Sequence, residues 1–135
     1  MYFFFIVETS PSYTSQPPSP SSVMEGHNLT LQWSYNLEGQ SIFVAYISND
    51  TGSSYRPSVA FRKINDTNTT VRSGLQKRIS ASISDSRASF TIFAVPKSAS
   101  AEKYQLTIIT ASPHYVFVTS DKVEISVLSK YVSLF

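Results

Sequence analysis

The chain has 135 residues, of which 41% are hydrophobic and 13% aromatic, so it predicts one folded domain and excludes a disordered segment. Its net charge of +2 and its charged fraction of 15% give no argument for binding to nucleic acid or to an anionic membrane. The chain contains no cysteine, which excludes disulfides, thiol catalysis and cysteine-based metal sites.

The compartment is indicated by asparagine rather than by cysteine. A lack of cysteine is by itself typical of a reducing compartment. Against this, four of the five asparagines begin an Asn-x-Ser/Thr sequon, namely Asn28, Asn49, Asn65 and Asn68. The sequons predict a glycoprotein of the secretory pathway, extracellular or at the cell surface. Turn-forming asparagines beside abundant threonine are the alternative interpretation.

The two ends of the chain are expected to lie outside the domain. Residues 1–20 combine an apolar run, 1–7, with a Pro- and Ser-rich stretch that is typical of an extended linker or an edge segment. The run 1–7 has only some of the features of a signal peptide. No apolar stretch of the chain approaches the length of a transmembrane helix. We expect a domain over 21–128, a tail over 129–135, and any membrane anchor outside this chain.

The elements expected within the domain are short strands. Residues 28–35 place Leu29, Leu31 and Trp33 on one side and polar residues on the other, which predicts a half-buried strand. Similar patterns predict strands at 23–26, 41–48, 59–64, 71–74, 78–84, 89–95, 104–110, 115–119 and 123–127. Turns separate them roughly every ten residues and no helical period is sustained, so the fold class is all-β, a sandwich or a barrel.

Several of these strands, taken together, resemble the immunoglobulin superfamily. The segment 25–33, Glu-Gly-x-Asn-Leu-Thr-Leu-x-Trp, is similar to the family's strand B. Segments 87–92, 103–106 and 123–127 are similar to its strands E, F and G. The spacing from strand B to strand F, with extra strands in between, is similar to the V-type arrangement. The resemblance implies an immunoglobulin-like antiparallel β-sandwich of V type.

The resemblance also implies where the centre of the core lies. Trp33 and Leu106 stand where the family usually has cysteines, and strand C offers Val44, Ala45 and Tyr46 in place of a core tryptophan. Burying an indole stabilises by about 4 to 6 kcal/mol, which offsets the roughly 2 to 5 kcal/mol lost with a disulfide. The expected core residues are Trp33, Tyr104, Leu106, Leu31, Phe90 and Ile92.

The tyrosine corner, a motif of the family, is only partly present in this sequence. Tyr104 fits the position of the tyrosine corner, so its hydroxyl is expected to bond to backbone upstream. The acid that often stands four residues before this tyrosine is replaced by Ser100. The resemblance therefore leaves Glu102 or Asp85 as the expected partner of Arg78.

Catalysis is not expected. His27 and His114 fall in turns, without metal-binding spacing, and there is no Gly-x-Ser-x-Gly elbow. The carboxylates are scattered, and no calcium, phosphate or dinucleotide motif appears. We expect no catalytic residue, no metal site and no cofactor. A hydrolase would require one of the histidines beside a serine and a carboxylate.

The region 56–78 is basic. It contains a single acid, Asp66, and six basic residues: Arg56, Arg62, Lys63, Arg72, Lys77 and Arg78. As one patch they would bind an acidic protein or a sulfated or sialylated glycan. The other interpretation is a solvated edge whose charges deter edge-to-edge pairing.

Aromatic residues also occur outside the inward pattern, at Phe43, Phe61, Phe93, Tyr115 and Phe117. Gathered on the outer face of strands C, C′, F and G, they would form a partner-binding surface. The V-type resemblance implies homophilic or heterophilic pairing through that sheet. We predict a recognition, adhesion or receptor domain that binds a protein partner through this face or its loops. A glycan-binding β-sandwich that uses the basic region 56–78 is the alternative.

Overall fold

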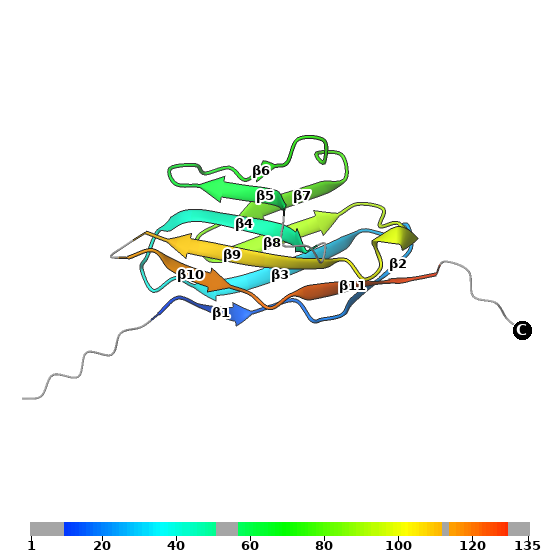
Figure 1. The fold of residues 1–135 in the computed structure, drawn as a ribbon, viewed down its shortest axis with the longest axis horizontal. Coiled ribbons are helices and arrows are strands. Elements are labelled where there is room, and N and C mark those ends of the chain that lie inside the picture. The colour runs from blue at the N-terminus through cyan, green and yellow to red at the C-terminus, as the bar shows by residue number, and fades with distance from the viewer. Residues whose placement is uncertain (1–9, 51–56, 112–113, 130–135) are drawn as a thin grey trace, which may run out of the picture.

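The computed structural model describes residues 10–50, 57–111 and 114–129. They form two β-sheets packed face to face (Figure 1). The elements are β1 (Ser12–Ser15), β2 (Ser21–Met24), β3 (Leu29–Asn36), β4 (Ile42–Asp50), β5 (Ser58–Lys63), β6 (Thr70–Val71), β7 (Ile79–Ile83), β8 (Arg87–Ile92), a 3₁₀ turn η1 (Lys97–Ala99), β9 (Lys103–Thr110), β10 (Val116–Thr119) and β11 (Val123–Leu128). The predicted all-β sandwich is confirmed.

The smaller sheet has the strand order β1-β3-β8-β7 and is antiparallel throughout. Its register places Leu31 opposite Phe90 and Trp33 opposite Ala88, so one side of the sheet is apolar and buried. The positions that point the other way are polar: Thr30, Gln32, Ser80, Ser82, Ser89 and Thr91. One face is packed and one is solvated, as is common in antiparallel sheets.

The larger sheet has the order β2-β11-β9-β4-β5-β6, with β10 also paired to β9. β10 pairs with residues 107–110 of β9, whereas β11 pairs with Lys103 and Tyr104. β2 lies parallel to β11, with Val23 opposite Val127. β11 is therefore an interior strand, held between the amino-terminal β2 and β9.

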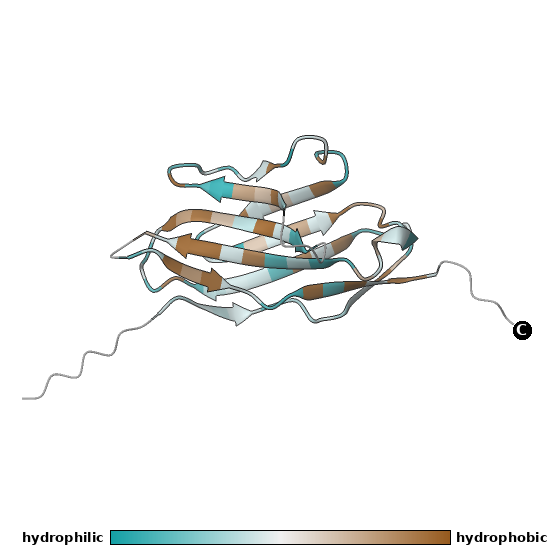
Figure 2. Ribbon diagram, in the orientation of Figure 1, coloured by the Kyte–Doolittle hydropathy of each residue, from teal (hydrophilic) through white to brown (hydrophobic). Residues whose placement is uncertain are grey.

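The core lies between the sheets and is built as predicted around Trp33 and Leu106, both 0% exposed. All six expected core residues are buried, with at most 7% of their surface exposed. Strands of the two sheets differ in hydropathy. In Figure 2, β9, β10 and β11 contain hydrophobic stretches, whereas β1 has intermediate hydropathy. The larger sheet thus contains apolar residues beyond those that the core requires.

Strand β4 departs from the predicted pattern at its start. Its pairing with β9 shifts register around Phe43, which makes Phe43 an extra residue in the strand. Beyond the shift, Ala45 and Ile47 face the core and are 0% exposed, while Val44 and Tyr46 face away. Of the three residues that strand C offers in place of a core tryptophan, only Ala45 is in the core, and Ile47 is buried on the same side.

The sandwich begins earlier than residue 21. β1 pairs with β3, and the Tyr13 hydroxyl reaches the other sheet, where it donates to the carbonyls of Leu106 (3.0 Å) and Val118 (2.8 Å). Residues 12–15 are thus an edge strand of the domain and not a linker before it. The run 1–7 and the tail beyond 129 lie outside the described residues. Within the described ranges, no helix has the length and apolar character needed to cross a membrane.

Candidate functional site

The outer side of the larger sheet carries a band of apolar side chains across four strands. The register aligns Phe117, Ile109, Val44 and Lys63 from β10, β9, β4 and β5 in one row. The next row joins Thr119, Thr107, Tyr46 and Phe61. Both rows alternate with buried core positions, so their side chains point away from the core. We call these eight residues the front face.

Four of the five predicted outward aromatics belong to the front face or its margin. Phe117 is 66% exposed, and Tyr115, just before β10, is 64% exposed. The Tyr115 ring lies 5.0 Å from that of Phe43, between ring centroids. At the opposite margin, the Lys63 ammonium sits 5.4 Å from the centre of the Phe61 ring, within cation–π range. The front face thus combines aromatic and aliphatic side chains with two threonines, and it has a cation at one margin.

The outer sides of the two sheets differ in chemistry. The outward positions of β3, β7 and β8 are all polar or charged, including Thr30, Gln32, Ser34, Ser80, Ser82, Arg87, Ser89 and Thr91. Single exposed apolar residues are ordinary on a protein surface, but an apolar band across several strands is typical of an interaction site. Phe93 is the exception among the predicted aromatics, because it lies on the connection after β8 and lines a separate cavity.

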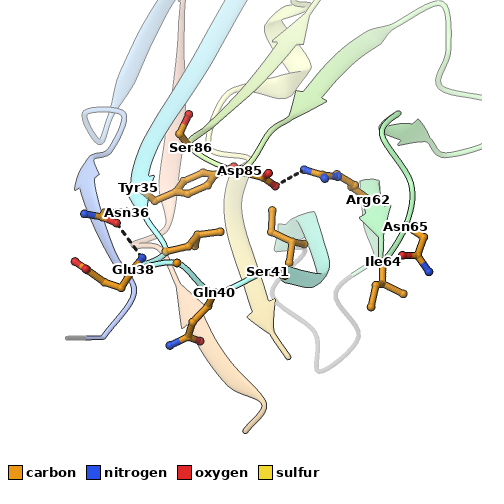
Figure 3. Close-up of a pocket in the computed structure, with 13 residues that line it drawn as sticks. Tyr35, Asn36, Glu38, Gln40, Ser41, Arg62, Ile64, Asn65, Asp85 and Ser86 are labelled. Carbon is orange, nitrogen blue, oxygen red and sulfur yellow. Dashed lines mark hydrogen bonds and ion pairs between the residues drawn. The ribbon is translucent and has the colours of Figure 1, made fainter. Parts of the chain in front are cut away.

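An open cleft of about 820 Å³ lies at the end of the sandwich where the β3–β4, β5–β6 and β7–β8 connections approach one another (Figure 3). The β3–β4 turn forms one wall. In it, Asn36 Oδ1 accepts a hydrogen bond from the Glu38 backbone N–H (2.9 Å), and Glu38 and Gly39 have φ of +54° and +77°. An asparagine that bonds two residues onward and a glycine at positive φ are ordinary turn chemistry, so the sequence pattern located this turn.

The opposite wall contains an ion pair that links the sheets. Arg62 of β5 is 17% exposed in its side chain, and its Nη1 lies 3.1 Å from Asp85 Oδ1. Its Nη1 also donates to the Ile83 carbonyl (3.3 Å) and its Nε to the Asp66 carbonyl (2.8 Å). Since Ile83 and Asp85 belong to the smaller sheet and its turn, Arg62 connects the two layers. The predicted pairing of Arg78 with Asp85 is wrong.

The predicted basic residues have different environments. Arg62 is paired with Asp85 at the cleft wall, and Lys63 belongs to the front face. Three others are exposed on the connection between β6 and β7, namely Arg72, Lys77 and Arg78. Arg56 lies outside the described residues. The basic patch stays a prediction.

The tyrosine-corner position has a different acceptor from the one predicted. The Tyr104 hydroxyl donates to Glu102 Oε2 (2.8 Å) and not to upstream backbone. Burial raises the pKa of Tyr104 well above its usual value, and the charge and hydrogen bond of Glu102 raise it further. With Glu102 bonded to Tyr104, the Arg78 guanidinium has no hydrogen bond or ion pair within the described part of the chain.

The four sequon asparagines have different environments. Asn65 and Asn68 are exposed on the connection between β5 and β6. Asn28 is exposed too, and its Oδ1 accepts a hydrogen bond from the Ala94 N–H (2.9 Å), which orients the side chain. Asn49 is half-buried within β4. Three of the four are therefore accessible for modification.

The two histidines are exposed and lie in separate connections, His27 between β2 and β3 and His114 just before β10. Among residues 10–50, 57–111 and 114–129, no three His, Asp or Glu side chains are grouped to hold a metal ion.

Comparison with known proteins finds the fold but not a family. No family model matches the chain, and no curated protein sequence matches it. By contrast, 1994 chains of solved structures are similar. One belongs to a structure described as the structural basis of T cell specificity and activation by the bacterial superantigen toxic shock syndrome toxin-1. It matches with a TM-score of 0.67 and 14% identity over 87% of this chain and 98% of the other. Such a likeness shows the fold alone, and so common a fold selects no function.

Proposed function

We propose that this chain is a V-type immunoglobulin-like domain that acts in extracellular recognition. The strand orders support this assignment. The order β1-β3-β8-β7 corresponds to A-B-E-D, and β11-β9-β4-β5-β6 corresponds to G-F-C-C′-C″. The motif at 25–33 falls on the strand B position, and Tyr104 falls on strand F. The accessible sequons Asn28, Asn65 and Asn68 support a secretory and glycosylated protein.

The front face is the surface that we assign to partner binding, and its contrast with the smaller sheet carries the proposal. An exposed Phe117 and a row of apolar neighbours would be costly to leave in water if they had no partner, because apolar surface is stabilised by about 25 cal/mol per Å² when buried. The Lys63 margin and the threonines supply the polar rim that protein interfaces have. The partner is accordingly a protein with an apolar surface.

A second copy of the chain is the simplest such partner. A two-fold axis would bring the front face against its own copy and so bury the apolar residues of both, and two-fold dimers are the commonest protein assemblies. Glycan binding through the region 56–78 receives less support, because Arg62 is largely buried and already paired with Asp85.

The test is sedimentation velocity over a range of protein concentrations, with Phe117→Ser as the variant. We expect concentration-dependent dimers for the native chain and a weakening of at least about tenfold for Phe117→Ser, since a few large aromatic side chains supply most of the binding energy of an interface. Leu128→Ser is the matched control, because Leu128 is 49% exposed at the far end of β11. Dimers that survive Phe117→Ser unchanged would exclude the front face as the contact. A native chain that stays monomeric would exclude self-pairing.

A further inference from the structure

A second, more enclosed cavity lies between the two sheets at the end opposite the cleft. It encloses about 380 Å³, within the range of small-molecule pockets. The larger sheet contributes Val59 and Tyr104, and the smaller sheet contributes Ile79 and Phe90. The connection after β8 covers it, and this is where the exposed aromatic Phe93 lies.

The floor of this inter-sheet cavity is apolar and preformed. Val59, Ile79, Phe90 and Ile92 line it, and none of them is more than 7% exposed. Since these side chains already belong to the packed core, the cavity does not require the sheets to separate. A ligand that enters would bury an apolar group against a rigid surface, which is the favourable case for small-molecule binding.

The walls carry two charges of opposite sign that are not paired with each other. Arg78 and Glu102 both line the cavity, yet no ion pair within 4.0 Å joins them among the described residues. Glu102 uses Oε2 to accept the Tyr104 hydroxyl, which fixes the carboxylate at the wall. The Arg78 side chain is exposed and lacks a protein partner in the described ranges. Its five N–H groups are available to a ligand carboxylate.

Arg78 is left without an acidic partner because of two other residues. Asp85, one of the two acids expected to pair with Arg78, is held by Arg62 at the other end of the sandwich. Ser100 also cannot neutralise Arg78, and its hydroxyl accepts the Val127 backbone N–H at 3.2 Å. Neither Asp85 nor Ser100 therefore neutralises Arg78.

We propose that this inter-sheet cavity binds a zwitterion with an apolar body, namely a large apolar α-amino acid. Its carboxylate bonds to the guanidinium of Arg78, its ammonium to the carboxylate of Glu102, and its side chain enters the apolar floor. Charged hydrogen bonds of this kind are stronger than neutral ones and fix the orientation of the ligand. The site is separate from the front face, so this inference does not depend on the proposed partner.

The test is an NMR titration of the ¹⁵N-labelled chain with L-phenylalanine, which reports both affinity and location. We expect saturable amide shifts in residues 75–79 and 93–104. N-acetyl-L-phenylalanine lacks the ammonium, 2-phenylethylamine lacks the carboxylate, and glycine lacks the apolar body. Each of the three should bind at least about tenfold more weakly. The first two each lose a charged hydrogen bond, and glycine loses the burial of an apolar side chain.

Arg78→Gln should weaken L-phenylalanine binding by about tenfold or more, for the same reason. Lys77→Gln is the matched control, because Lys77 is a neighbouring exposed cation that does not line the cavity. An unchanged thermal midpoint for both variants establishes that the fold is intact. Absence of saturable shifts at millimolar L-phenylalanine would overturn the proposal, as would equal binding by Arg78→Gln and the native chain.

Discussion

Trp33 fills the centre of the sandwich completely, yet its indole Nε1 has no hydrogen-bond partner among the described residues. An unpaired buried donor costs about 1 to 3 kcal/mol. The burial of so large an aromatic surface outweighs that cost. Trp33 therefore stabilises the domain through its volume, not through its polar atom.

Two substitutions separate these contributions. Trp33→Ala should lower the free energy of unfolding by about 3 to 5 kcal/mol, because it leaves a cavity between the sheets. Trp33→Phe should cost clearly less, since it keeps much of the apolar volume and removes the unpaired donor. Urea denaturation followed by circular dichroism measures both. Equal losses for the two variants would contradict this account.

For single residues, the sequence predicted which side chains face the core wherever apolar and polar residues alternate without interruption along a strand. Trp33, Phe90 and Leu106 were identifiable because their neighbours alternate with them. The pattern failed at Phe43, because a bulge inserts one residue and reverses the sides that follow. Partners of single charges, such as Asp85 for Arg62, depend on the packing of distant strands and leave no local signal.

At the scale of elements, Arg62 joins a strand of the larger sheet to a turn of the smaller one. Its three hydrogen-bond acceptors come from the β5–β6 connection, from β7 and from the β7–β8 turn. The residue is largely buried, whereas its partner Asp85 is 79% exposed. Most of the stabilisation should therefore come from the backbone carbonyls and little from the exposed carboxylate.

This difference is testable by comparing the two partners. Arg62→Met should cost about 1 to 3 kcal/mol, because it leaves the carbonyl of the buried Ile83 without this donor and removes the bond to the Asp66 carbonyl. Asp85→Asn should cost less than about 1 kcal/mol, in the range of exposed ion pairs. Urea unfolding of both variants at the same ionic strength gives the comparison. A larger loss for Asp85→Asn would show that the ion pair dominates.

The strands themselves could be predicted, but not how they are combined. Alternation predicted a strand near every observed one after residue 21, while β1 was assigned to a segment before the domain. The parallel pairing of β2 with β11 and the separate registers of β10 and β11 on β9 are set by contacts between distant residues. The inter-sheet cavity was missed for the same reason, because its lining comes from segments far apart in the chain.

For the whole molecule, three buried tyrosines link stability to pH. Burial raises the pKa of Tyr13, Tyr35 and Tyr104 well above 10 in the folded protein. For Tyr13 the neighbouring Tyr35 adds to the effect, while at Tyr35 the Arg62 charge opposes it and Asp85 adds to it. Above pH 10 the unfolded chain releases protons that the folded chain retains. Stability is therefore complete below about pH 10 and declines above it.

We expect the free energy of unfolding to fall between about pH 9 and about pH 11, by at most about 1.4 kcal/mol per pH unit for each of these tyrosines. Tyr104→Phe should reduce the slope, since one titrating group is removed. Urea unfolding at several pH values measures it. Tyr115→Phe serves as the control, because Tyr115 is 64% exposed. A slope that Tyr104→Phe leaves unchanged would count against this linkage.

The position of β11 has a consequence for the order in which the protein acquires its structure. β2 near the start of the chain pairs only with β11, among the described strands, and Tyr13 bonds to carbonyls of β9 and β10. A ribosome releases the amino-terminal segments first. During synthesis, β1 can pair early with β3, whereas β2 has no strand partner until almost the whole domain has emerged. A nascent chain that stops before Val123 therefore leaves β2 unpaired. Folding of this domain should be a late event that follows translation of its final strand.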